Sequence, residues 1–163
     1  MTLDGNSILT LTGTVWVTGN LFLKSNTAIQ LDPSYNPYSG IIVVDGQVSL
    51  DSNVTFCGSE GYKSAGKCNL PAAGNYLMIL SVKNSTGQED PAIISTSNTK
   101  TAVLYASNGF ITLNSQSNLK EATGVGIKMN SNANVSYETG LANAKFSSGP
   151  GGGWILKSWE EIE

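Results

Sequence analysis

The sequence predicts an all-β fold, specifically a single-stranded right-handed parallel β-helix with three sides, about five to six coils and a short C-terminal capping segment. Three observations lead to this fold. Charged residues make up only 13% of the chain. Apolar and polar residues alternate along most of its length, with almost no helical periodicity before the last ten residues. The strand candidates come in triplets that can be laid over one another, as expected for a solenoid rather than a sandwich.

The composition also excludes several classes of function. The chain has 163 residues with no His, and its nine basic residues are all Lys. Without His, Ser-His-Asp and Cys-His catalysis are excluded, and without Arg no bidentate clamp for phosphate or carboxylate can form. The net charge of −3 lacks the basic stripe that nucleic-acid binding requires, so we expect no nucleic-acid partner.

The triplets predict three inward-facing columns of apolar side chains. The first column contains Val15/Val17, Ile42/Val44, Leu77/Ile79, Leu104/Ala106 and Ile127/Met129. The second contains Leu21/Leu23, Val48/Leu50 and Ile111/Leu113, and the third contains Ile29/Leu31, Val54/Phe56, Ile93 and Leu119. The interval of 23 positions between Ala106 and Met129 gives the length expected of one uninterrupted coil.

Two segments interrupt this period and predict insertions. One is the turn-rich segment 32–40, and the other is the loop between Cys57 and Cys68. Both would project from the same corner of the coil. Asparagine tolerates the left-handed backbone region and can form side-chain ladders at stacked corners. The asparagines expected at corners are Asn20, Asn26, Asn53, Asn108, Asn114 and Asn130.

Cys57 and Cys68 enclose a polar, glycine-rich loop, for which a disulfide is the simplest interpretation. The alternatives are two unrelated thiols or a metal site, but no His or further Cys can complete a metal shell. A disulfide implies an oxidising compartment.

The predicted domain boundary lies near the C-terminus. Residues 1–146 form the parallel β-helix domain, and residues 147–163 form a Gly-rich linker and a capping tail. Apolar residues Ile155, Trp159 and Ile162 have helical spacing, so the tail is expected either to fold back over the last coil or one face, or to bind a partner. No segment has the length of a membrane span or the pattern of a signal peptide. Any membrane attachment is therefore expected through an N-terminal segment absent from this sequence.

The C-terminal part carries a family resemblance. The Asn-rich coils followed by Tyr137–Phe146 and by the sequence SSGPGGGW at 147–154 resemble the β-helical ectodomains of PilX-type pilus-associated proteins of candidate-phylum bacteria. The likeness extends over nearly the whole chain. It implies a surface location and a pilus or adhesion role, and it carries over no catalytic residue.

Carbohydrate binding is the main alternative function. Aromatic side chains on a β surface can stack on sugar rings. The aromatic residues expected to face outward are Trp16, Phe22, Tyr35, Tyr38, Tyr62 and Tyr105. Tyr35, Tyr38 and Tyr62 lie in or beside the two insertions and are the candidate ligand-binding residues. Aromatic residues on a β surface also pair with one another without any ligand.

A polysaccharide-acting enzyme and an ice-binding protein are weaker alternatives. β-Helical polysaccharide enzymes need clustered carboxylates, whereas Asp45 and Asp51 are expected at different corners. Ice binding needs a repeated column of threonines, and the outward positions do not supply one. The sequence therefore predicts a non-catalytic extracellular structural or adhesive domain without cofactor or required metal, whose partners are other surface proteins, pilus proteins or glycans.

Overall fold

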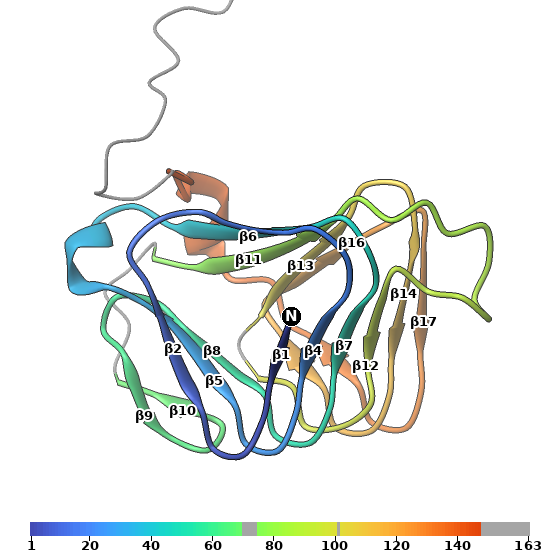
Figure 1. Cartoon of the computed structure of the whole chain (residues 1–163), viewed down its shortest axis with the longest axis horizontal. Helices are drawn as coiled ribbons and strands as arrows, with labels where there is room; N and C mark the ends of the chain where they lie inside the picture. Colours follow the sequence, from blue (N-terminus) through green and yellow to red (C-terminus); the bar gives the residue numbers. More distant parts are fainter. Residues whose placement is uncertain (70–74, 101, 148–163) are drawn as a thin grey trace, which may run out of the picture.

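The computed structural model describes residues 1–69, 75–100 and 102–147, and these form an all-β fold built from parallel sheets (Figure 1). Within these ranges every pairing between strands is parallel except one hairpin, β9 (Tyr62–Ser64) with β10 (Lys67–Cys68). The all-β prediction is thus confirmed, and the parallel sheets are compatible with a β-solenoid. No helix in these ranges has the length and hydropathy needed to cross a membrane.

The strands lie on three faces. The six-stranded sheet has the order β1 (Thr2–Leu3), β4 (Leu21–Leu23), β7 (Val48–Leu50), β12 (Ile93–Ser95), β14 (Phe110–Leu113) and β17 (Gly126–Met129). The five-stranded sheet has the order β16 (Glu121–Thr123), β13 (Val103–Ala106), β11 (Leu77–Ser81), β6 (Gly40–Val44) and β3 (Val15–Val17). The third face contains β2 (Ile8–Leu11), β5 (Ala28–Leu31) and β8 (Thr55–Cys57), followed by β15 (Asn118–Leu119) and β18 (Asn134–Val135).

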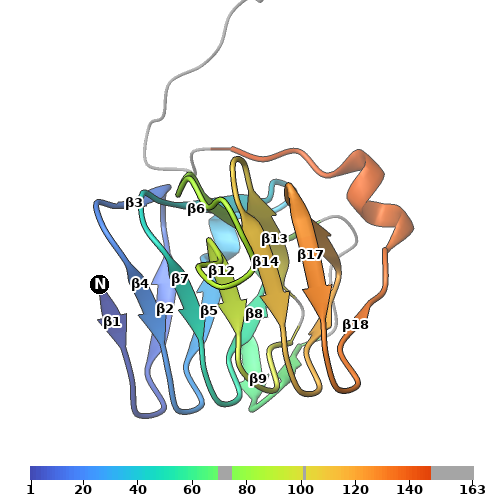
Figure 2. The same ribbon diagram turned by 90° about the vertical axis from the view of Figure 1, so that its right-hand side faces the viewer.

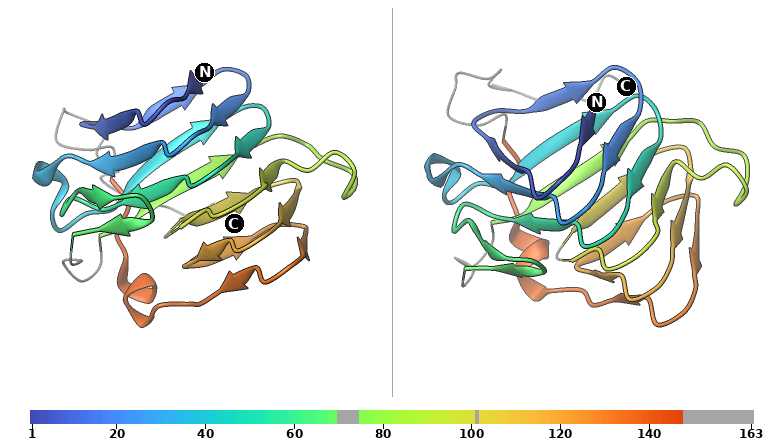
Figure 3. Two further views of the ribbon diagram at one scale, coloured as in Figure 1. Left: turned by 90° about the horizontal axis from the view of Figure 1, so that it is seen from below. Right: turned by 60° about the horizontal axis from the view of Figure 1, so that its bottom comes forward.

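The chain visits these faces in a fixed rotation. After each strand of the six-stranded sheet it passes to the third face, then to the five-stranded sheet, and then back. In the one passage with no named strand on the third face, Lys100 takes that place and pairs with Thr55 on one side and Asn118 on the other. Successive passages lie side by side from the N-terminal to the C-terminal end (Figure 3).

The registers explain the core. On the six-stranded sheet, Leu21 pairs with Val48, Val48 with Ile93, and Ile93 with Ile111, and all four side chains are fully buried. Side chains in a strand alternate between faces, so one matched register places a whole column of Leu, Val and Ile inside. The second predicted column is confirmed, with β12 inserted between its second and third members.

Two parts of the predicted columns are wrong. Ile127 and Met129 pair with Ile111 and Leu113 on the six-stranded sheet, not with Leu104 and Ala106. On the side away from β11, Leu104 pairs with Ala122, whose strand Glu121–Thr123 has too little apolar character to stand out in the sequence. Ile93 likewise belongs to the second column instead of the third.

The insertions lie where the sequence placed them. Segment 32–39, with the short 3-10 helix η1 (Pro33–Tyr35), and the segment containing β9 and β10 both connect the third face to the five-stranded sheet. Both therefore occupy one corner, at the left of Figure 1. We call this the insertion corner. A further insertion between β11 and β12, residues 82–92, leaves from a different corner and was not predicted.

The chain returns across the coils after the last strand. Residues 136–147, which include the 3-10 helix η2 (Thr139–Asn143), run back from β18 across the strands (Figure 2). The backbone N–H of Ser39 donates to the carbonyl of Lys145 at 2.7 Å, and the N–H of Ser147 donates to the carbonyl of Ser39 at 2.9 Å. We call residues 136–147 the strap, because this segment links β18 to the start of β6.

The corner between the six-stranded sheet and the third face carries a partial asparagine ladder. The Asn26 amide donates to Oδ1 of Asn6 at 3.0 Å, and the Asn53 amide donates to Oδ1 of Asn26 at 2.8 Å. All three residues have a positive φ of 61–66°. Asn130 and Asn114 make a similar contact at 2.8 Å. The predicted role of Asn26, Asn53, Asn114 and Asn130 at corners is thus confirmed.

Substitution of Asn53 tests this ladder. Asn53→Ala removes the amide contact. It also places alanine, which has a Cβ but no polar side chain to bond the backbone, in the left-handed region. We therefore expect a loss of about 1–2 kcal/mol in the free energy of unfolding. Asn53→Gly removes only the side-chain contact and should cost less. Urea denaturation of both variants measures the difference. Equal losses would show that backbone conformation does not determine the residue type here.

Candidate functional site

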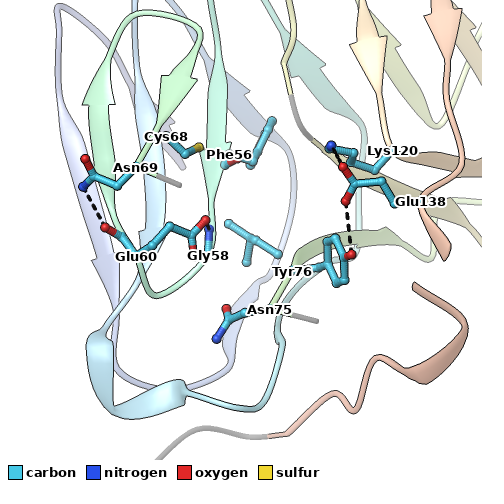
Figure 4. Close-up of a pocket in the computed structure, with 10 residues that line it drawn as sticks. Phe56, Gly58, Glu60, Cys68, Asn69, Asn75, Tyr76, Lys120 and Glu138 are labelled. Atoms are coloured by element: carbon cyan, nitrogen blue, oxygen red, sulfur yellow. Dashed lines mark hydrogen bonds and ion pairs between the residues drawn. The ribbon is translucent and has the colours of Figure 1, made fainter. Parts of the chain in front are cut away.

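A pocket of about 190 Å³ opens at the insertion corner (Figure 4). Loop residues between β8 and β11, the start of β11, the segment after β15 and the strap all contribute to its walls. The lining residues are Phe56, Gly58, Glu60, Cys68, Asn69, Asn75, Tyr76, Leu77, Lys120 and Glu138. It is smaller than the usual pockets for drug-sized ligands, so its volume suits a group the size of a single ring.

One wall is an interaction of three side chains. Glu138, at the start of the strap, forms an ion pair with Lys120 and accepts a hydrogen bond from the Tyr76 hydroxyl at 3.1 Å (Figure 4). Burial, together with the hydrogen bond to Glu138 and its negative charge, raises the pKa of Tyr76 to about 12. Tyr76 therefore remains a hydrogen-bond donor to Glu138 throughout the physiological pH range.

The opposite wall contains the carboxylate of Glu60, which makes fewer hydrogen bonds than that of Glu138. Oε1 of Glu60 accepts a hydrogen bond from the Gly58 N–H at 3.3 Å, whereas its buried Oε2 has no hydrogen-bond partner among the described residues. Burial raises the pKa of the Glu60 carboxyl, and the backbone hydrogen bonds lower it by less. Glu60 is therefore a lining group with one carboxylate oxygen that has unused capacity to accept a hydrogen bond.

The loop around Glu60 is held by its neighbours. Asn75 accepts the Ser59 N–H at 3.0 Å and donates to the Ser59 hydroxyl at 2.8 Å, while the Asn69 amide donates to the carbonyl of Glu60 at 2.7 Å. A Cβ on Gly58 would lie 2.5 Å from the Asn75 carbonyl oxygen. Only glycine allows this approach of the two backbone segments, so the pocket wall depends on Gly58.

The predicted disulfide between Cys57 and Cys68 is present, with a Cα–Cα distance of 5.5 Å. Cys57 is buried at the end of β8, and Cys68 ends the β9–β10 hairpin. The bond fixes the base of the hairpin beside the pocket, which Cys68 lines. It is consistent with an oxidising compartment.

The three tyrosines predicted to bind a ligand have different environments. Tyr35 is only 1% exposed and packs in the core, so its placement on the surface was wrong. A Cβ on Gly40 would lie 3.2 Å from the Tyr35 ring, which shows how closely the ring contacts the start of β6. Tyr38 is exposed and Tyr62 is half-buried, and neither lines the pocket.

Sequence reasoning missed most of the pocket. Lys120 and Glu138 are 18 residues apart and meet only because the strap turns back. Glu60 and Glu138 belong to no sequence motif that would mark them as pocket residues. Within residues 1–69, 75–100 and 102–147 no cluster of three or more Cys, Asp or Glu side chains is arranged to hold a metal ion. Comparisons with protein-family models, with curated proteins and with solved structures found no match.

The buried carboxyl of Glu60 predicts a specific pH dependence. Its native pKa lies above the ordinary value of 4.5, so the native state binds the proton more tightly than the unfolded chain. The stability that this proton contributes is present below pH 4.5 and is lost as the pH rises through the native pKa. Glu60→Gln should therefore give a higher free energy of unfolding than the parent at pH 7, with the advantage disappearing toward pH 4.

Denaturant unfolding at several pH values measures this effect. Glu89→Gln is the matched control, because it removes the same charge from an exposed insertion and should not change the pH dependence. If the free energy of unfolding of Glu60→Gln varies with pH in the same way as that of the parent, this would contradict a raised pKa of the Glu60 carboxyl in the native state.

Reduction of the disulfide should loosen the hairpin without melting the sheets. Closure of a loop with a sequence separation of 11 stabilises the protein by up to about 3 kcal/mol in the chain-entropy model. Hydrogen-exchange mass spectrometry after reduction should show faster exchange in residues 57–68 and unchanged exchange in β6 and β11. The double variant Cys57→Ser, Cys68→Ser should behave in the same way. Complete unfolding on reduction would show instead that the parallel sheets also depend on the disulfide.

Proposed function

We propose that this chain is a right-handed, three-sided β-solenoid of about five to six coils that serves as a non-catalytic structural or adhesive domain at the cell surface. The observation that carries the proposal is the fixed rotation of strands through three parallel faces, with two insertions gathered at one corner. Right-handedness follows from the strong preference of parallel crossover connections for that hand.

Rigidity is the proposed mechanism. Stacked coils bury continuous columns of Leu, Val and Ile, and such columns resist bending because each coil fixes its neighbours. The insertion corner would then hold Tyr38, the disulfide-closed hairpin and the pocket at fixed positions. The disulfide supports an extracellular location. The resemblance to PilX-type ectodomains supports a carrier that is pilus-associated or membrane-anchored.

The pocket also supports a role without catalysis. Hydrolysis of a glycosidic bond uses two carboxyl groups as acid and as base or nucleophile. Glu138 is already paired with Lys120 and hydrogen-bonded to Tyr76, which leaves Glu60 as the lining carboxyl with an open oxygen. An arrangement of this kind suits recognition of a ligand better than proton transfer.

Surface labelling tests the main proposal. Antibodies against the full chain should label intact cells that produce the protein, and external protease should remove the label. Labelling that requires permeabilised cells would exclude a surface role.

Carbohydrate binding is the second candidate, and the unpaired Glu60 oxygen, beside the aromatic rings of Phe56 and Tyr76 on the pocket walls, favours it. A glycan array probed with the full chain should give signals that fall at least several-fold in Glu60→Gln if the pocket binds the sugar. Tyr38→Ala is the comparison, because it removes an exposed aromatic residue outside the pocket. Loss in Tyr38→Ala alone would place the sugar on the surface aromatics, and no signal from the parent would reject carbohydrate binding. Cleavage of any bound glycan would contradict a non-catalytic role.

A further inference from the structure

The core is open at the end of the stack where β17 lies. On the six-stranded sheet, Ile127 pairs with Ile111 and Met129 pairs with Leu113. Ile111 and Leu113 are fully buried, whereas Ile127 is 42% exposed and Met129 is 48% exposed. In the left view of Figure 3 these strands, in orange, lie at the bottom of the stack, with η2 to one side. The capping tail predicted at 147–163 lies, apart from Ser147, outside the described residues.

The other two faces end in the same way. Val135 on β18 pairs with Leu119, and Ala122 on β16 pairs with Leu104. Leu119 and Leu104 are fully buried, but Val135 and Ala122 are only half-buried. Each inward column thus loses its cover at its last member. Contiguous apolar surface of this kind is typical of a site that contacts another molecule.

The backbone of β17 also has an open edge. This strand is outermost in the six-stranded sheet, where its partner is β14. Directly after β17, Asn130 donates its N–H to the carbonyl of Leu113 at 2.8 Å. Successive N–H groups of a strand point to opposite edges, so those of Met129 and Ile127 point away from β14. An edge of this kind can pair with a strand of another molecule.

The sequence of this edge is complementary to itself in the antiparallel direction. When two copies of β17 are aligned with Ile127 opposite Ile127, Val125 lies opposite Met129 and Gly126 lies opposite Lys128. Lys128 is the only charged residue of β17, and this register places it opposite a glycine. A register centred on Lys128 would instead place two like charges opposite each other, which is destabilising.

We propose that two copies of this chain associate end to end through β17, related by a twofold axis that passes between the two Ile127 residues. The contact continues the six-stranded sheet from one copy into the other and covers Ile127 and Met129. A twofold contact uses the same surface on both partners and closes on itself, so the assembly stops at a dimer. The dimer depends on strand topology and exposure and on no property of the proposed surface role.

Sedimentation equilibrium of the full chain over a range of concentrations tests the proposal. The parent should change from monomer to dimer as the concentration rises. Ile127→Lys places two like charges at the axis and should weaken dimer formation by about ten-fold or more. Val82→Lys is the matched control, because Val82 is 40% exposed but lies in the insertion between β11 and β12. This variant should form dimers as the parent does.

A mixture of two variants tests the twofold register. Ile127→Glu alone should also remain monomeric, but an equal mixture of Ile127→Lys and Ile127→Glu should form dimers, because the axis then brings opposite charges together. Circular dichroism verifies that each variant keeps its β-sheet spectrum. If an Ile127 variant fails to fold, Met129→Lys mixed with Val125→Glu replaces the pair, since the register places these two positions opposite each other.

Four outcomes would overturn the proposal. They are a parent that stays monomeric at every concentration, an assembly that grows beyond the dimer, a dimer that persists in the lysine variant, and a mixture in which both variants stay monomeric. Growth beyond the dimer would assign the open end to a head-to-tail contact, because such contacts do not close on themselves.

Discussion

The structure depends on the register of backbone hydrogen bonds between successive coils. Parallel strands cannot be joined by a tight hairpin, so the chain must complete a whole circuit before it can pair with the previous coil. Each circuit must therefore reach every corner with nearly the same backbone conformation. At the corner between the six-stranded sheet and the third face this requirement is met by left-handed residues on every circuit. They include Asn6, Asn26, Asn53, Asn98, Gln116 and Asn132.

The same corner shows how the core accommodates polar groups. The buried hydroxyl of Ser95 lies 2.6 Å from that of Thr99 and 2.7 Å from that of Ser117, and Ser117 also donates to the carbonyl of Asn114 at 2.7 Å. Buried hydroxyls are tolerated when they satisfy one another or the backbone. Small polar side chains thus occupy buried positions at this corner, and the columns of Leu, Val and Ile continue beside them.

Alternation of apolar and polar residues predicted the all-β fold and the second column, because alternation is a local pattern. The disulfide was predicted from the two cysteines that enclose a polar loop. The alternation pattern by itself was not sufficient for the whole fold. It failed where a coil carries few apolar residues, as at Glu121–Thr123, and where an unrecognised insertion at 82–92 changed the spacing before Ile93. The pocket could not be predicted, because the contact of Lys120 with Glu138 depends on the return path of the strap. Tyr35 looked like a surface aromatic residue because it lies in a turn-rich segment, but its ring packs against Gly40 and enters the core.

The strap changes how the stack can come apart. A simple stack of repeats frays from its ends, because a terminal unit contacts only one neighbour. Here residues 145–147 are hydrogen-bonded to Ser39, so the chain leaving the last coil is fastened near the beginning of the stack. If the C-terminal strands are to separate from their neighbours, the hydrogen bonds of Ser39 with Lys145 and Ser147 must break. Otherwise the separated segment forms a loop whose two ends remain attached to the protein. The domain should consequently withstand pulling from its C-terminal side as one cooperative unit, with the load carried into β6 before it reaches β18.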